Sequence, residues 1–129
     1  MLQVIIHKVL TNDRQRNGRL ADEVRQVVID VLELDESFGK VIIYEAPMYD
    51  RSNYENGDLN FVFVEIMMFA GRMEETKTLL VQQVIEKIEK IEGVVRDEIN
   101  CAIHEINSEN YYVGKEIATT PPSPTIKSL

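Results

Sequence analysis

Apolar and polar residues alternate along the chain in blocks that predict four strands and two helices. Short blocks rich in β-branched and aromatic residues are typical of strands. They lie at 2–10, 40–46, 61–69 and 98–106. Longer blocks with apolar residues three and four positions apart indicate amphipathic helices. These span 20–34 and 74–92, and Gly93 is expected to end the second.

The order of the blocks predicts an α/β protein built from two β-α-β units. Unit one covers 1–47 and unit two covers 60–106. Right-handed crossovers then place both helices on one face of a four-stranded sheet. The segment 61–69 is the most hydrophobic in the chain, which predicts a central parallel strand covered on both faces. Since no further long helix remains, the other face of the sheet is expected to be buried by other subunits.

The two units also share a short sequence pattern. Gly18-Arg19 and Gly71-Arg72 each stand at the expected start of a helix, at an offset of 71 − 18 = 53. Val28 and Val81 keep that offset. This pattern predicts a duplicated unit whose two helices open on the same dipeptide.

Length and composition favour one domain, at 1–118, followed by a disordered tail at 119–129. The chain has 129 residues, of which 44% are hydrophobic, enough for a single core. The tail contains three of the four prolines and little that could be buried. A net charge of −8 argues against nucleic acid as a partner.

The sequence shows no marker of a metal site, a cofactor or a membrane. Cys101 is the only cysteine, so an intramolecular disulfide is excluded and a reducing compartment fits. No zinc spacing, phosphate loop, dinucleotide fingerprint or nucleophile elbow occurs, and we expect neither metal nor cofactor. Residues 2–10 contain polar positions and lack a preceding basic region, so neither a signal peptide nor a membrane span is expected. These observations predict a cytoplasmic protein.

Unit two carries an ordered set of motifs between Asn60 and Gly114. They are a strand ending in Ala70-Gly71-Arg72, a first helical turn with Glu74, Glu75 and Lys77, the strand residues His104-Glu105, and the turn Glu109-Asn110-Tyr111. This set resembles the tautomerase superfamily, in the fused two-unit branch similar to malonate semialdehyde decarboxylase and chloroacrylate dehalogenase. The resemblance implies a tautomerase-like fold, a homotrimer and sites between subunits.

The chain lacks several of the residues on which the catalytic chemistry of that branch depends. Family members act through an N-terminal proline, whereas this chain reads Met1-Leu2, and the bulky Leu2 is expected to leave Met1 in place. Ala70 stands where decarboxylase-like members carry an additional arginine, and the turn tryptophan is Tyr111. Ser37-Phe38-Gly39 occupies the neighbourhood of their aspartate. Of the family's usual constellation, Arg72 alone is retained at a matching position.

The candidate site residues are Met1 and Arg72 for catalysis, and Arg72, Tyr111 and Lys115 for substrate binding. Arg72 stands at a strand-to-helix junction that favours anions, although a structural ion pair or cap explains it equally well. An unperturbed α-amine, the group that Met1 would supply, has a pKa of about 7.7–8.0, within reach of acid-base work, and the alternative is an ordinary solvated terminus. For Tyr111 and Lys115 the alternative is packing between subunits.

Three polar residues inside apolar strands have roles that the sequence leaves open. His7 and His104 are each either a satisfied core histidine or a catalyst. Glu65 must be paired if it is buried, within the sheet or across an interface, with a general base as the alternative. Cys101 is interpreted as a small buried hydrophobe.

The leading hypothesis is a trimer with a small anion-accepting pocket that catalyses keto-enol isomerisation of a 2-oxo acid. Whether the protein is an enzyme stays open, and if it is active it is a tautomerase-type isomerase. The alternative is a non-catalytic trimeric binding or structural protein that has kept the fold. A small organic acid is the expected ligand in either case.

Overall fold

The strands and helices form in the predicted order. The computed structural model describes residues 2–114 and 116–117. Its strands are β1 (Leu2–Val9), β2 (Lys40–Ala46), β3 (Val62–Phe69) and β4 (Ile99–Ile106), and its helices are α1 (Arg14–Leu32) and α2 (Glu74–Glu92). Short turns η1 (Met48–Asp50), η2 (Arg96–Glu98) and η3 (Ser108–Asn110) and a hairpin of β5 (Tyr112–Val113) and β6 (Glu116–Ile117) complete the described fold.

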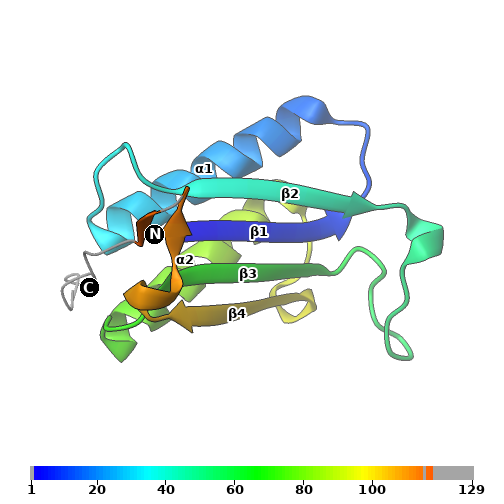
Figure 1. Cartoon of the computed structure of the whole chain (residues 1–129). Coiled ribbons are helices and arrows are strands. Elements are labelled where there is room, and N and C mark those ends of the chain that lie inside the picture. The colour runs from blue at the N-terminus through cyan, green and yellow to red at the C-terminus, as the bar shows by residue number, and fades with distance from the viewer. Residues whose placement is uncertain (1, 115, 118–129) are drawn as a thin grey trace.

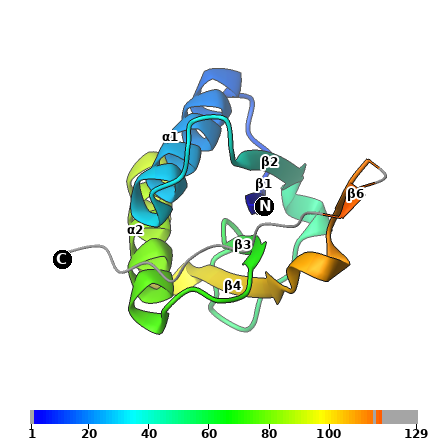
Figure 2. The same cartoon turned by 60° about the vertical axis from the view of Figure 1, so that its left-hand side comes forward.

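The sheet has the strand order β2-β1-β3-β4, and both helices lie behind it in Figure 1. Figure 2 shows this two-layer arrangement from the side, with the β5–β6 hairpin beyond the sheet. The predicted two-unit α/β fold with both helices on one face is therefore confirmed. We call the sheet surface that faces away from the helices the open face.

The prediction for segment 61–69 was correct in part, because the strand is central and has one parallel neighbour. β3 is parallel to β4 but antiparallel to β1, with Leu2 opposite Met68, and helices cover only one of its faces. Val64 and Ile66 point to the helices and are fully buried, while Phe63 is partly exposed on the open face. An apolar run indicates burial on two sides, but it specifies neither strand direction nor what provides the cover.

The core lies between the sheet and the helices. Alternate residues of β1, such as Val4 and Ile6, pack with the stripes of both helices, whose central members are Val24 and Val84. All four side chains are inaccessible or nearly so. Burying a side chain of this size contributes about 1.5–3 kcal/mol, so this layer dominates the stability of the domain.

Helix α1 begins six residues earlier than predicted. The Asp13 side chain caps it by accepting a hydrogen bond from the Arg16 backbone nitrogen at 2.9 Å. Gly18 and Arg19 therefore lie inside α1, whereas Gly71 and Arg72 precede α2. The prediction that the same dipeptide opens both helices was wrong, because the first turn of α1 is polar and does not display the stripe.

The structure reveals the true spacing of the duplication. The two helices begin at residues 14 and 74, an offset of 74 − 14 = 60, and both contain 19 residues. The same offset relates the start of β1 to that of β3 and the end of β2 to that of β4. Buried positions correspond as well, for example Leu20 with Leu80 and Val24 with Val84. The chain is thus a tandem repeat of 60 residues.

Helix α2 has the boundaries that its sequence predicts. It ends where Gly93 adopts the left-handed conformation, with φ of 70°, and donates its N–H to the Glu89 carbonyl. No described helix is long and apolar enough to cross a membrane. Met1, Lys115 and the predicted tail at 119–129 lie outside the described residues.

Candidate functional site

Arg72 lies between the end of β3 and the start of α2. Gly71 turns the chain with φ of 119°, a conformation that favours glycine, and Met73 is the N-cap of the helix. Met73 provides no side-chain cap, so the first N–H groups of α2 receive no side-chain acceptor from it. The junction thus combines a guanidinium with the positive end of a helix, which together attract an anion.

Burial affects the charge of Arg72 only slightly. The side chain is half-buried, and this burial lowers the pKa of its guanidinium. An arginine nevertheless keeps its proton near neutral pH, because its ordinary pKa lies several units above neutrality. Nearby, Lys77 in the first turn of α2 pairs with Glu105 at 2.9 Å. The Thr76 hydroxyl is buried there, and no described residue hydrogen-bonds to it.

The start of β1 lies at the same end of the sheet. Because β1 and β3 are antiparallel, Leu2 faces Met68, four residues before Arg72. Gln3 Nε2 donates a hydrogen bond to the Tyr111 hydroxyl at 3.1 Å. The Tyr111 ring also packs edge-on against Phe69, with ring centroids 5.8 Å apart. Tyr111 is thereby fixed beside the first residues of β1.

A loop held by Arg25 joins the same end of the sheet. Arg25 of α1 donates to the carbonyl oxygens of Gly39 at 3.0 Å and Phe38 at 2.8 Å, and also to that of Glu36. Gly39 precedes β2 with φ of 89°, and a Cβ built on it would lie 3.8 Å from Leu2 Cδ2. Phe38 is half-exposed here. Sequence reasoning missed Arg25 because an arginine on the polar side of a helix carries no sign of its distant carbonyl partners.

Of the predicted site residues, the structure therefore brings Arg72 and Tyr111 to one end of the sheet. Met1 and Lys115, the other two candidates, are outside the described residues. Gln3 and the Arg25-held loop add to the same region. A cation, a helix N-terminus and a phenol thus lie at the same end of the sheet.

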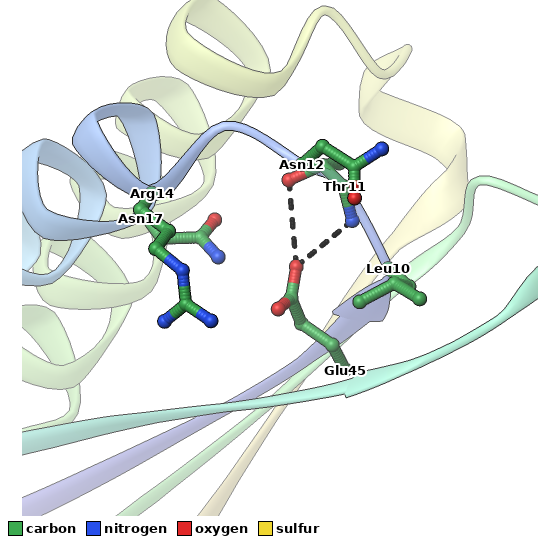
Figure 3. A pocket seen from close by; sticks show the side chains of 6 residues that line it. All are labelled: Leu10, Thr11, Asn12, Arg14, Asn17 and Glu45. Atoms are coloured by element: carbon green, nitrogen blue, oxygen red, sulfur yellow. Dashed lines mark hydrogen bonds between the residues drawn. The ribbon is translucent and has the colours of Figure 1, made fainter.

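The opposite end of the sheet has a cavity of about 280 Å³. Figure 3 shows its six lining residues, which are Leu10, Thr11, Asn12, Arg14, Asn17 and Glu45. Glu45 accepts hydrogen bonds from the Thr11 backbone nitrogen at 3.0 Å and from its hydroxyl at 3.4 Å. Burial opposes ionisation of Glu45, but hydrogen bonds from Asn17, Thr11 and Lys8 outweigh it and hold its pKa below the usual range.

This cavity is the counterpart of the Arg72 region in the tandem repeat. At the 60-residue offset, Asn12 corresponds to Arg72, Asn17 to Lys77 and Glu45 to Glu105. The arginine is present in unit two and replaced by an amide in unit one. The two ends of the sheet are thus chemically different, and Arg72 marks the end that suits an anion.

Glu65 connects two histidines across the open face. Its Oε2 lies 2.7 Å from His7 Nε2 and its Oε1 lies 3.1 Å from His104 Nε2. The predicted pairing of Glu65 within the sheet is confirmed. Both histidines are satisfied but are not core residues, because their side chains are 40% and 49% exposed. No group of three or more potential metal ligands among the described residues has a metal-binding arrangement.

One family model matches part of the chain. The family model described as "Tautomerase enzyme" matches residues 63–120, which include most of β3 and all of α2 and β4. A comparison with curated proteins finds no match.

Solved structures match nearly the whole chain. A fused 4-OT solved as an asymmetric trimer has a TM-score of 0.82 at 16% identity, covering 90% of this chain and 95% of its own. FG41 malonate semialdehyde decarboxylase inhibited by 3-bromopropiolate has a TM-score of 0.74 at 20% identity, covering 87% and 88%. N1, of the cis-3-chloroacrylic acid dehalogenase family, has a TM-score of 0.81 at 16% identity, covering 93% and 85%. At these identities the likeness establishes a shared fold.

Proposed function

We propose that this tautomerase-superfamily protein binds a small organic acid at Arg72 and isomerises it between keto and enol forms. The observation that carries the proposal is the antiparallel register, which places the first residues of β1 beside the end of β3 that leads to Arg72. The guanidinium and the N-terminus of α2 would hold the carboxylate of a 2-oxo acid. Tyr111, fixed by Gln3 and Phe69, would line the same pocket.

The acid-base group in this proposal is a free amine at Met1. Such an amine changes charge close to neutral pH, which suits the proton transfer between carbon and oxygen that interconverts enol and ketone. Lys115 would contribute a second cation toward the substrate. Neither group lies within the described residues, so both assignments rest on sequence alone.

A ketonisation assay with phenylenolpyruvate tests the activity. We expect the untagged protein to accelerate loss of the enol absorbance, and an N-terminal extension beyond Met1 to abolish that rate. Arg72→Ala should reduce it by about 10²-fold, the usual cost of removing one charge-stabilising group. Arg19→Ala is the matched control, because Arg19 follows a glycine too but pairs with Glu23 on the surface of α1. It should leave the rate unchanged.

A non-catalytic acid-binding protein is the second candidate function. It is favoured by Leu2, which stands where the catalytic proline of the resembled family would follow the initiator. Calorimetric titration with pyruvate separates the two candidates. Binding that is lost in Arg72→Ala without turnover would support the second, whereas neither binding nor turnover would remove both.

We further propose that the protein is a homotrimer assembled through the open face. This face exposes Ile42, Tyr44 and Phe63, large apolar side chains that favour burial against another surface. The similar fused 4-OT structures are trimers. Light scattering should therefore report three times 14.9 kDa. A monodisperse monomer at micromolar concentration would contradict this assembly.

A further inference from the structure

The open face carries one ionisable cluster in the middle of an apolar surface. His7 of β1, Glu65 of β3 and His104 of β4 form a row across three strands, which we call the triad. The His7 ring lies nearly parallel to Tyr44 and Phe63 on either side, with centroids 5.8 Å away in both cases. The triad is therefore part of the surface that an associating copy would cover.

Few other charges face the triad. Among the described strand residues on the open face, the remaining charged side chain is Lys40, whose register position is opposite Gln3, four residues along β1 from His7. Tyr44 is the titratable neighbour on β2, and Glu109 lies in the turn after β4. Three other charged strand residues point to the opposite face of the sheet, toward the helices, and form their ion pairs there. They are Lys8, Glu45 and Glu105. The triad must therefore balance its own charge.

Glu65 remains ionised throughout the range in which histidines titrate. The hydrogen bond from His7 lowers the pKa of Glu65 most, burial partly opposes this, and His104 lowers it further. Imidazoles gain their proton between about pH 8 and 5. The triad has a charge of −1 with both imidazoles neutral, zero with one added proton and +1 with two.

We propose that the triad is a proton-dependent anchor of the contact between copies of this chain, which forms when the triad holds one added proton and weakens when it holds two. The inference rests on the open-face assembly proposed above. A carboxylate with one imidazolium has no net charge and tolerates burial, whereas a net charge removed from water is costly. With two imidazoliums every copy brings a charge of +1 to the contact, and the copies repel one another.

The direction of the effect distinguishes it from general electrostatics. The chain has a net charge of −8 at pH 7 and a pI of about 4.8, so acidification towards pH 5 reduces the overall repulsion between copies. Overall charge therefore predicts tighter association at pH 5, and the triad predicts weaker association. Each proton that a copy must release to associate changes the association constant by up to about tenfold per pH unit.

Analytical ultracentrifugation of the full chain at pH 7.5, 6.5, 5.5 and 5.0 measures this dependence. For the unmodified protein we expect the association constant to fall at least about tenfold from pH 6.5 to 5.0. His7→Gln and His104→Gln keep an amide donor for Glu65 but remove one titratable group. In either variant the triad cannot exceed zero charge, so association at pH 5.0 should be as strong as at pH 6.5 or stronger.

Glu65→Gln and Lys40→Gln complete the design. Without the carboxylate the triad has no charge until its first proton makes it positive, so Glu65→Gln should lose association at a higher pH than the unmodified chain. Lys40→Gln removes a cation from the same face that does not contact the triad, and it should retain the unmodified pH profile. Circular dichroism at each pH verifies that every variant is folded.

The outcomes separate this inference from the assembly on which it rests. A trimer whose association strengthens on acidification, or whose weakening persists unchanged in both histidine variants, would overturn the anchor and leave the trimer intact. A monomer at every pH would overturn both. Loss of acid weakening in the two histidine variants, together with its earlier onset in Glu65→Gln, would establish the anchor.

Discussion

Replacing Lys8 by methionine would remove the most deeply buried charge in the described structure. The Lys8 side chain is fully inaccessible, and its ammonium contacts Glu92 Oε1 at 3.1 Å and Glu45 Oε2 at 3.3 Å. It also donates to Asn17 Oδ1 at 3.0 Å and to the Val9 carbonyl at 3.2 Å. Methionine fills a similar volume but satisfies none of these oxygens.

Loss of the Lys8 ammonium destabilises the protein mainly through Glu92. Its side chain is 3% exposed, and without Lys8 its described cationic partner is Arg16, whose Nε lies 3.2 Å from Oε2. Glu45 is destabilised less by the loss of Lys8, because its side chain is 21% exposed to water and keeps the hydrogen bonds from Thr11. Breaking a buried ion pair on one side costs about 3–5 kcal/mol, since the other charge stays buried. We expect Lys8→Met to lower the free energy of unfolding by that amount, or Tm by roughly 10–20 °C.

The tandem repeat supplies the matched rescue. At the 60-residue offset Lys8 corresponds to Met68 and Glu92 to Leu32, both of which are buried in the core. The fold thus already has apolar residues at the two positions that correspond to Lys8 of unit one and Glu92 of unit two. The double variant Lys8→Met with Glu92→Leu should return to within about 1–2 kcal/mol of the unmodified protein, because a well-packed apolar pair replaces a buried ion pair without loss.

Urea unfolding at one fixed protein concentration, followed by circular dichroism, measures all four proteins of this double-mutant cycle. Glu92→Leu alone should also destabilise, because it leaves the Lys8 ammonium with one carboxylate fewer. The reasoning is refuted if Lys8→Met costs less than about 1 kcal/mol, or if the double variant loses the sum of the two single losses.

Further predictions concern the thiol, two glycines and the C-terminal segment. Burial raises the pKa of the Cys101 thiol to about 11, so at pH 8 a disulfide reagent should label the native protein about 10²-fold more slowly than the urea-unfolded chain, and equal rates would contradict this. Gly93→Ala should destabilise by about 1 kcal/mol because φ is 70°, whereas Gly18→Ala, in the interior of α1 with open space around it, should stabilise by about 0.5–1 kcal/mol. Urea unfolding should therefore give opposite signs for the two substitutions. Deleting 120–129 should change Tm by less than about 2 °C, as that Pro-rich segment has little apolar surface, and a large drop would show that it docks.

The apolar pattern predicts elements well where their ends carry a local signal. Helix α2 has its predicted limits because the stripe continues to its last turn and Gly93 follows it. Helix α1 extends six residues beyond the prediction, because Asp13 is a capping signal without an apolar residue in the next turn. The strand order and the antiparallel centre of the sheet are not encoded locally, and the prediction of a parallel strand at 61–69 therefore holds for its pairing with β4 but not for its pairing with β1.

The candidate site was predictable only where its residues form a local sequence pattern. Arg72 stands out because a Gly-Arg dipeptide between a strand and a helix is a local pattern, and the structure places it at that junction. The triad could not be assembled from sequence, since Glu65 is 58 residues from His7 and 39 from His104. Glu65 by itself was informative, because a single carboxylate in an apolar strand needs a partner. Its partners are His7 and His104, which the sequence analysis also noted as polar residues within apolar strands.

Covalent tandem duplication also changes what each position can become. In a symmetric dimer of one-unit chains, a single codon would set both members of every corresponding pair, and a cation at one site would face the same cation at its symmetry mate. Within one chain the two members mutate separately. Lys8 can be charged while Met68 is apolar, and Arg72 can be kept while Asn12 stands in its place. The fused chain therefore permits two ends of different chemistry on a scaffold that remains nearly symmetric.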